Sequence, residues 1–154
     1  MKTLDFLKKE AIITNLSSRN KKETLEEMAA PVAKILKTDN EILVRALMER
    51  EQLGSTGYDN GVGLPHAKLK NIQDTVLSFG VSKQGIDFDS LDGSPTHIFF
   101  LLLTPENSAG IHLRLLAKIS KILKNENFRQ KVIKAKTSEE ILSIIKKADE
   151  KYSE

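Results

Sequence analysis

The chain has 154 residues, 40% of them hydrophobic and 29% charged. This length suffices for one hydrophobic core but not for two ordinary domains, so we expect a single domain over residues 1–154. It contains no cysteine, which excludes disulfides, thiolate nucleophiles and cysteine-ligated metal sites. The 24 basic and 21 acidic residues leave a net charge of +3, which alone is weak evidence for nucleic-acid binding.

The N-terminal part of the chain predicts a strand followed by a helix. A β-branched run at residues 12–16 is typical of a short strand. Apolar residues then recur at helical spacing between Leu25 and Leu36, and Asn20 is the expected N-terminal cap. Pro31 lies inside this pattern and lacks an amide donor, so we expect it to kink the helix.

A second helix is expected directly after the first. Thr38 and Glu41 have the spacing of a capping box, and the helical pattern continues until Gly54. On an ideal helical wheel Arg50 falls on the buried side of this helix, near its end. A guanidinium on that side needs an acceptor, and an anion that binds transiently would supply one.

The middle of the chain predicts three strands. Asn60-Gly61 is a turn signal before a short strand at residues 62–64. A strand pattern with alternating residues follows at residues 75–81. Residues 98–103 form an unbroken apolar run, which we expect to be a strand buried on both faces of a sheet.

The C-terminal third predicts three helices, at residues 111–123, 128–135 and 138–148, the last opened by a capping box of Thr137 with Glu140. The expected order is therefore β-α-α-β-β-β-α-α-α, which indicates an α/β protein with a three-layer α/β/α sandwich on a small mixed sheet. The longest apolar run is far shorter than a bilayer span, and the first ten residues lack the apolar segment of a signal peptide. We therefore expect a cytoplasmic protein without membrane insertion.

The stretch GVGLPHAKL, residues 61–69, places His66 directly after a proline. Proline forces the residue before it into an extended conformation, so Leu64 should continue the strand and Pro65 should end it, leaving His66 on a rigid strand end. Gly63 lets a phosphate or another chain come close to the backbone. A lone histidine at a strand end is usually a hydrogen-bonded residue without a chemical role, so its neighbours decide the interpretation.

His112 is the neighbour that matters most. On the wheel of the predicted helix it falls in the middle of the apolar arc, so its ring faces the protein interior. It also lies in the first turn, where the helix dipole disfavours an imidazolium, which suits a neutral hydrogen-bond donor. Arg50, His66 and His112 thus form a possible phosphate site, although wheels alone do not bring the three together.

Three stretches, LMEREQLGSTGYDNGVGLPHAKL, GIDFDSLDGSPTHIFFLLLTPE and HLRLLAKISKIL, resemble in order and spacing the enzyme IIA domains of the fructose and mannitol type. These domains belong to the bacterial phosphoenolpyruvate-dependent sugar phosphotransferase system, and the nitrogen-regulatory paralogue of that system is equally similar. The resemblance covers nearly the whole chain, and its most specific element is the glycine-rich run into Pro65-His66. It implies the same fold as the pattern of strands and helices.

The resemblance further implies a phosphohistidine carrier that needs no metal and no other cofactor. His66 would accept a phosphoryl group on Nε2 from the histidine-containing phosphocarrier protein and pass it to a IIB domain, with Arg50 and His112 flanking the phosphate. Ser55 and Thr56 are further candidates for phosphate binding, together with Gly63, although the two hydroxyl residues also suit an ordinary turn. Because no cysteine-bearing IIB domain is fused here, we expect a free-standing carrier.

Two uses of the same His66 stay open. The phosphoryl group either feeds sugar uptake or switches docking to regulatory target proteins, and the nitrogen-regulatory use is slightly favoured because the protein stands alone. The alternative is a non-catalytic regulatory binding module whose docking depends on phosphorylation. Leu64, Leu69 and Ile72 are candidates for the centre of a docking surface, and ordinary core packing explains them equally well.

Two other classes of site are weaker. Residues 111–136 hold eight Lys or Arg and one acid, and Arg114, Lys118, Lys121 and Lys124 line the polar face of their helix. Such a face is usually only solvated, so nucleic acid is not an expected partner. The three histidines match no metal-ligand spacing, and His97 is expected to be a packed or edge residue at the start of a strand.

Overall fold

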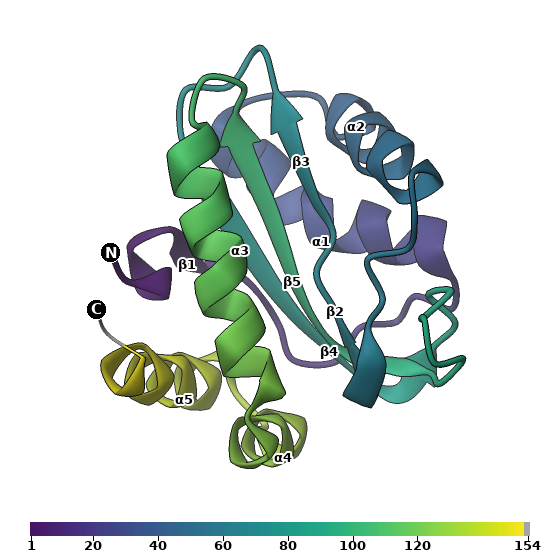
Figure 1. The fold of residues 1–154 in the computed structure, drawn as a ribbon, viewed down its shortest axis with the longest axis vertical. Coiled ribbons are helices and arrows are strands. Elements are labelled where there is room, and N and C mark those ends of the chain that lie inside the picture. Colours follow the sequence, from purple (N-terminus) through teal and green to yellow (C-terminus); the bar gives the residue numbers. More distant parts are fainter. Residues whose placement is uncertain (153–154) are drawn as a thin grey trace.

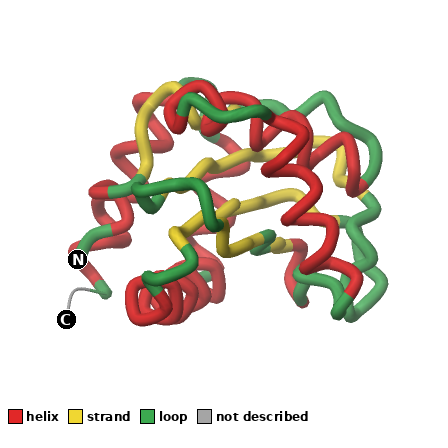
Figure 2. Tube along the Cα trace, turned by 90° about the horizontal axis from the view of Figure 1, so that it is seen from above, coloured by secondary structure: helices red, strands yellow, loops and turns green. Residues whose placement is uncertain are grey.

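The computed structural model describes residues 1–152, in which five strands form one sheet with helices on both faces (Figures 1 and 2). The elements follow in the order η1 (Thr3–Asp5), β1 (Leu7–Ile13), α1 (Lys21–Leu36), α2 (Asn40–Gln52), η2 (Asp59–Gly61), β2 (Val62–Gly63), β3 (His66–Leu69), β4 (Val76–Ile86), β5 (Thr96–Pro105), α3 (Ala109–Lys124), α4 (Glu126–Lys134) and α5 (Ser138–Lys151).

The sheet is mixed, with the strand order β1-β4-β5-β2 and with β3 also paired to β5. β1 runs parallel to β4, β4 runs antiparallel to β5, and β2 and β3 both run parallel to β5. Val62 pairs with Ile98 and His66 pairs with Leu102, so both short strands keep the same register along β5. They form one edge strand that is interrupted between Gly63 and His66.

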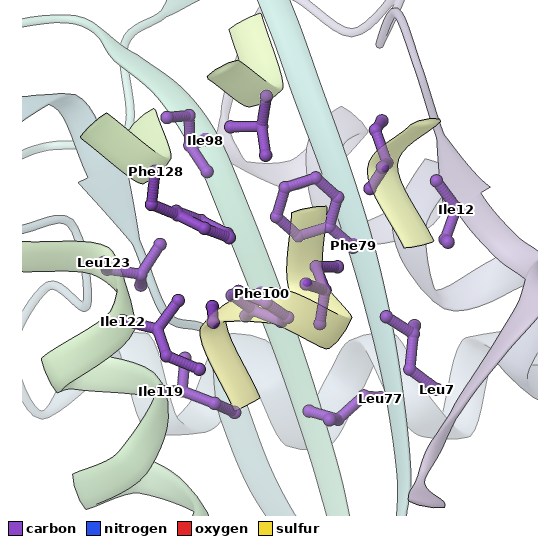
Figure 3. Packing of buried hydrophobic residues seen from close by; sticks show 14 of the residues in the cluster. Leu7, Ile12, Leu77, Phe79, Ile98, Phe100, Ile119, Ile122, Leu123 and Phe128 are labelled. Atoms are coloured by element: carbon purple, nitrogen blue, oxygen red, sulfur yellow. The ribbon is translucent and has the colours of Figure 1, made fainter. Parts of the chain in front are cut away.

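Two hydrophobic clusters lie on opposite faces of the sheet and produce the three layers. One cluster joins α3, α4 and α5 to Ile98, Phe100 and Leu102 of β5, and Figure 3 shows its packing around Phe79, Phe100 and Phe128. The other joins α1 and α2 to the odd-numbered residues of β5. The expected sandwich is confirmed, and so is the expectation that the apolar run of residues 98–103 is buried on both faces.

The first strand lies earlier in the chain than the sequence predicts. It spans Leu7–Ile13 instead of residues 12–16, and its central residues Lys8, Lys9 and Glu10 are exposed. β1 is an edge strand, so only part of it faces the core and its middle carries polar side chains. The apolar pattern therefore marks its end better than its beginning.

The capping predictions for the first two helices have mixed outcomes. The Asn20 side chain accepts a hydrogen bond from the amide of Glu23 at 2.9 Å, as expected. The cap of α2 is Asp39 and not Thr38, because the amide of Thr38 still bonds the carbonyl of Ala33 and closes the C-terminus of α1. α1 itself runs without a break through the proline in its interior.

The two ends of the described chain meet beside α3, and Figure 1 shows them at the same side of the molecule. Asp149 of α5 accepts hydrogen bonds from the amides of Thr3 and Leu4 at 2.9 and 3.1 Å. Lys118 of α3 lies 3.3 Å from the same carboxylate and donates to the carbonyl of Met1. Lys118 is only 7% exposed, so its predicted place on the polar face of the helix is wrong.

Within residues 1–152, no helix combines the length and the apolar character that crossing a bilayer requires.

Candidate functional site

The edge strand is interrupted just before His66. The sequence predicts that the strand continues through Leu64 and ends at Pro65, but the structure differs. β2 ends at Gly63, the amide of Leu64 turns away to bond the carbonyl of Thr56, and Pro65 has no amide to offer. Pairing with β5 resumes when the Pro65 carbonyl accepts from the amide of Leu102 at 2.9 Å. His66 therefore begins a strand, whereas the sequence predicts that it follows the end of one.

The ring of His66 has one nitrogen fixed and one without a partner. Nδ1 lies 2.7 Å from the carbonyl oxygen of Leu64, and because this oxygen only accepts, Nδ1 carries the hydrogen of the neutral ring. Within residues 1–152, no hydrogen bond reaches Nε2. Burial lowers the pKa of His66 below its usual 6.5, although the bond to Leu64 opposes this, so the ring is neutral at pH 7 and Nε2 presents a lone pair.

His112 approaches His66 from the first turn of α3. The two ring centroids are 5.4 Å apart and the ring planes meet at 62°. Nδ1 of His112 lies 2.7 Å from the hydroxyl oxygen of Thr104 on β5. Burial lowers the pKa of His112 to about 4, with smaller contributions from the charges of His66 and Lys68, so this ring is also neutral at pH 7. The predicted inward direction of the ring is confirmed, since the residue is buried.

An open depression of about 460 Å³ lies between α2, β3 and α3 and brings the predicted residues together. Arg50, His66 and His112 all line it, together with Lys68. Arg50 is half-buried, not fully on the buried side, and its guanidinium donates to the carbonyl of Gly54 at 3.0 Å. The depression thus combines two cationic side chains and two neutral imidazoles with one carboxylate, the exposed Glu49. The cations outnumber the acid, so the composition suits an anion.

Ser55 and Thr56 do not line this depression, and their hydroxyl hydrogens are already used. Ser55 donates to the carbonyl of Phe88 at 2.8 Å, and Thr56 donates to the carboxylate of Glu51. The amide of Thr56 bonds the same carboxylate at 3.0 Å. These contacts match the turn interpretation and hold the loop between α2 and β2 against the body of the protein.

Gly63 also lies outside the lining of the depression, and its local role is packing. A Cβ atom at this position would lie 2.9 Å from the ring of Phe99, closer than side chains approach one another. His97 lies apart from the other two histidines, and its Nδ1 is 2.8 Å from the carbonyl oxygen of Ser82. In the described part of the chain, no group of three or more His, Asp or Glu side chains is arranged to hold a metal ion.

The residues proposed for a docking surface belong to the core. Leu64 is 2% exposed, and Leu69 and Ile72 are each 8% exposed, so of the two interpretations left open, ordinary core packing holds and the docking surface does not. Two other leucines at the depression are exposed instead: Leu53 at the end of α2, 84% exposed, and Leu113 on α3, 66% exposed. A helical pattern does not reveal them because each lies outside the apolar face of its helix.

Three polar residues at or beside the site were missed from the sequence. Lys68 follows His66 by two residues on the same strand, and the alternation of a strand puts both side chains on one face. This two-residue spacing could have identified Lys68 from the sequence. Glu51 is 7% exposed and forms an ion pair with Lys21 at 2.9 Å. No sequence signal identifies this pairing or the contact of Thr104 with the ring of His112.

Comparisons with known proteins agree with the fold. The model of the family described as "Phosphoenolpyruvate-dependent sugar phosphotransferase system, EIIA 2" matches residues 5–148. The nitrogen regulatory protein of Bradyrhizobium diazoefficiens is 33% identical over 145 residues, which is 94% of this chain and 95% of that protein. The fructose-specific EIIABC component of Bacillus subtilis is 33% identical over 97% of this chain, which spans only 24% of that relative.

Solved structures show the same arrangement of elements. The nitrogen regulatory protein IIA-Ntr from Neisseria meningitidis superposes with a TM-score of 0.87 and 28% identity, covering 92% of this chain and 97% of that one. IIA mannitol from Escherichia coli superposes with a TM-score of 0.76 and 18% identity over 88% of this chain and 96% of that one. The second likeness concerns the fold alone.

Proposed function

We propose that this chain, which belongs to the EIIA type 2 family of the phosphoenolpyruvate-dependent sugar phosphotransferase system, carries a phosphoryl group on Nε2 of His66. Membership of this family implies a role in phosphoryl transfer. The observation that carries the choice of atom is the hydrogen bond from Nδ1 to the carbonyl oxygen of Leu64. It holds the ring still and leaves the Nε2 lone pair at the open depression.

The transfer step follows from this geometry. The Nε2 lone pair attacks the phosphorus of a phosphohistidine donor, a new N–P bond forms, and the electron pair of the old N–P bond returns to the donor ring. Nδ1 of His66 keeps its hydrogen, so the phosphorylated ring gains positive charge and its bond to Leu64 becomes charge-assisted. No general base is needed, because the attacking nitrogen is already unprotonated at pH 7.

The other residues of the depression would stabilise the transferred group. Arg50 and Lys68 supply positive charge that offsets the phosphoryl oxygens, and His112 is a neutral group beside the reacting nitrogen. Donors that are already in position require little rearrangement when charge develops in the transition state. Ser55, Thr56 and Gly63 have no part in this proposal, since their contacts lie elsewhere.

The partners follow from the same proposal. The donor would be the histidine-containing phosphocarrier protein and the acceptor a IIB domain or a regulatory target. A structural neighbour of 17% identity, enzyme IIA mannitol of Escherichia coli, has been solved in complex with phosphorylated enzyme IIB mannitol. In this chain Leu53 and Leu113 are exposed at the depression, which gives a docking partner an apolar centre beside the charged groups.

A second use of the same phosphate is as a regulatory switch. The similarity to the nitrogen regulatory protein of Bradyrhizobium diazoefficiens covers 95% of that protein, and the neisserial IIA-Ntr structure superposes at a TM-score of 0.87. A phosphoryl group would add charge and acceptor oxygens between the two exposed leucines, so it would change the affinity for a docked protein. We favour this regulatory use over sugar uptake.

Incubation with phosphoenolpyruvate, enzyme I and the phosphocarrier protein tests the proposal. We expect one acid-labile, base-stable phosphate, detected by intact mass, and its loss in His66→Ala. His97→Ala is the matched control, because this histidine lies outside the depression, and it should be labelled like the wild type. Continued labelling of His66→Ala would place the phosphate on another residue and refute the proposal.

A discharge experiment separates the two uses. The phosphorylated protein is mixed with a purified IIB domain of the fructose type, and in parallel used as bait beside His66→Ala in a pull-down. Rapid loss of the phosphate to the IIB domain supports sugar uptake. A slow discharge together with partners that bind only one phosphorylation state supports the regulatory switch.

A further inference from the structure

We propose that Thr104 is a positioning residue whose hydroxyl donates to Nδ1 of His112 and thereby keeps the hydrogen of that ring on Nε2, where it serves as a donor to the phosphoryl group. The inference rests on the proposed function of His66. It concerns a residue of β5 that lies under the depression and not in its lining.

Thr104 is placed beneath the site by the register of the sheet. It pairs with Lys68 of β3, as Leu102 pairs with His66, so its side chain lies on the face of the sheet that α3 covers. The residue is fully buried. Its hydroxyl oxygen lies 2.7 Å from Nδ1 of His112, which reaches down from the first turn of α3.

The direction of this hydrogen bond follows from the needs of the hydroxyl. If Nδ1 carried the hydrogen and donated to Thr104, the hydroxyl hydrogen would need an acceptor of its own. Within residues 1–152, the ring of His112 is the one hydrogen-bond partner of that hydroxyl. A buried hydroxyl without an acceptor is costly, so the arrangement in which Thr104 donates is favoured by about tenfold or more.

The two rings at the site then have complementary roles. The Leu64 carbonyl keeps hydrogen on Nδ1 of His66 and leaves its Nε2 bare, whereas Thr104 keeps hydrogen on Nε2 of His112. One ring is the nucleophile and the other a donor for a phosphoryl oxygen, and neither has to be protonated. The opposite tautomer of His112 would turn a lone pair toward the phosphoryl oxygens and repel them.

The first test reads the tautomer directly in the unphosphorylated protein. Nitrogen-15 NMR of the histidine side chains at pH 7 should show hydrogen on Nε2 of His112 in the wild type and in Thr104→Ser, which keeps the hydroxyl. Thr104→Val has nearly the same shape without the hydroxyl, and in it the Nε2–H population should fall by about tenfold relative to the other tautomer. The His66 signals should stay unchanged, because the Leu64 bond is intact.

Hydrogen on Nδ1 of His112 in the wild type would overturn the proposal, and so would an unchanged tautomer in Thr104→Val. This readout needs no partner protein and no phosphate, so it stands even if His66 proves not to be phosphorylated. The wild-type spectrum alone remains decisive if Thr104→Val does not fold.

The second test measures transfer from the phosphocarrier protein. Thr104→Val should lower kcat by about tenfold, less than the roughly 100- to 1,000-fold loss for removing a preorganised donor outright, because the His112 ring stays in place and only its tautomer balance shifts. KM should stay constant, because Thr104 is buried below the docking surface. Thr104→Ser should restore the rate. A lower rate that Thr104→Ser does not restore, with the tautomer unchanged, would mean that Thr104 acts through packing alone and would overturn the proposal.

Discussion

His66 and His112 lie in contact and are both kept neutral by burial, which links the chemistry of the site to protein stability. Burial of a neutral imidazole does not reduce the stability of the fold at pH 7. Protonating it there costs free energy, because the charge is placed where water is scarce. The unfolded chain does not have this difficulty. The protein therefore becomes less stable in acid in part because of the same residues that we propose to bind phosphate.

The sign and range of this effect follow from the pKa of His112. It is about 4 in the folded chain, against 6.5 for an ordinary histidine. As the pH falls through 6.5 the unfolded chain takes up a proton and the folded chain does not, so stability that is fully present above pH 6.5 is lost progressively down to about pH 4.

We predict that His112→Gln flattens this pH dependence. The drop in the free energy of unfolding between pH 6.5 and pH 4 should be smaller by about 1–2 kcal/mol, below the full value of the shift because the ring borders an open depression. Urea unfolding curves at a series of pH values measure it, with His97→Gln as the control. Parallel curves for wild type and His112→Gln would contradict the prediction.

At the scale of elements, the loop between α2 and β2 is fixed by a buried carboxylate. Glu51, at the end of α2, accepts from both the amide and the hydroxyl of Thr56 and pairs with Lys21 of α1. Lys21 also lies 3.2 Å from Asp89, whose side chain is exposed. Because the carbonyl of Thr56 receives the amide of Leu64, this network also supports the backbone that holds His66.

We predict that Glu51→Gln destabilises the protein by about 2 kcal/mol, because Lys21 loses its buried partner and keeps only the weaker exposed one. Hydrogen exchange of the amides in residues 53–64 should also become faster. Glu49→Gln, an exposed substitution on the same helix, should change stability by less than about 0.5 kcal/mol. Equal stabilities for the two variants would show that the Glu51 network does not contribute measurably to the free energy of unfolding.

Elements with a clear period were predicted well from the sequence. The inward direction of His112 follows from the 3.6-residue repeat of α3, and the burial of β5 follows from its unbroken apolar run. The start of β1 was missed because an edge strand exposes its middle residues. The cap of α2 was misplaced because Thr38 closes the previous helix, a contact that the spacing of residues does not encode.

The candidate site was predicted in part for the same reason. Arg50, His66 and His112 each carry a local signal, and the structure brings them to one depression. Thr56 was a candidate ligand although its local sequence suits a turn somewhat better, and its contact with the carboxylate of Glu51, five residues earlier, decides for the turn. The exposure of Leu53 likewise depends on where α2 ends relative to β3, which local patterns do not determine.

At the scale of the whole molecule, one buried ion pair joins the N-terminus to two helices. Lys118 of α3 and Asp149 of α5 are 7% and 1% exposed, and between them they bond the backbone of Met1, Thr3 and Leu4. Removing one partner of a buried pair leaves the other charge uncompensated.

We predict that Lys118→Met lowers the free energy of unfolding by about 3 kcal/mol, because Asp149 keeps its two amide donors but loses its cation. Lys121→Met, an exposed change on the same helix, should stay within about 0.5 kcal/mol of the wild type. Equilibrium unfolding in urea measures both. If the two variants unfold alike, the buried pair is not a main connection between the chain ends.

The arrangement of α2 and α3 around the edge strand also determines how a partner would dock. The end of α2 and the first turns of α3 lie on two sides of β3, so the exposed Leu53 and Leu113 stand at one depression with His66 between their elements. A partner that docks over this depression would meet both leucines. Apolar side chains at the centre of an interface usually contribute more to affinity than the charged rim.

We predict that Leu53→Ser and Leu113→Ser each raise KM for the phosphocarrier protein by about tenfold, because each variant loses a docking contact. The value of kcat and the unfolding midpoint should stay nearly unchanged, because neither variant loses a core contact. Leu91→Ser is the matched control: Leu91 is 70% exposed but lines a different hollow, beside Tyr58 and Leu123. Initial rates of phosphoryl transfer at varied phosphocarrier concentration give both constants. A rise in KM for Leu91→Ser as large as that for Leu53→Ser would mean that exposed apolar area anywhere on the surface assists docking, and the interface would then not be centred on His66.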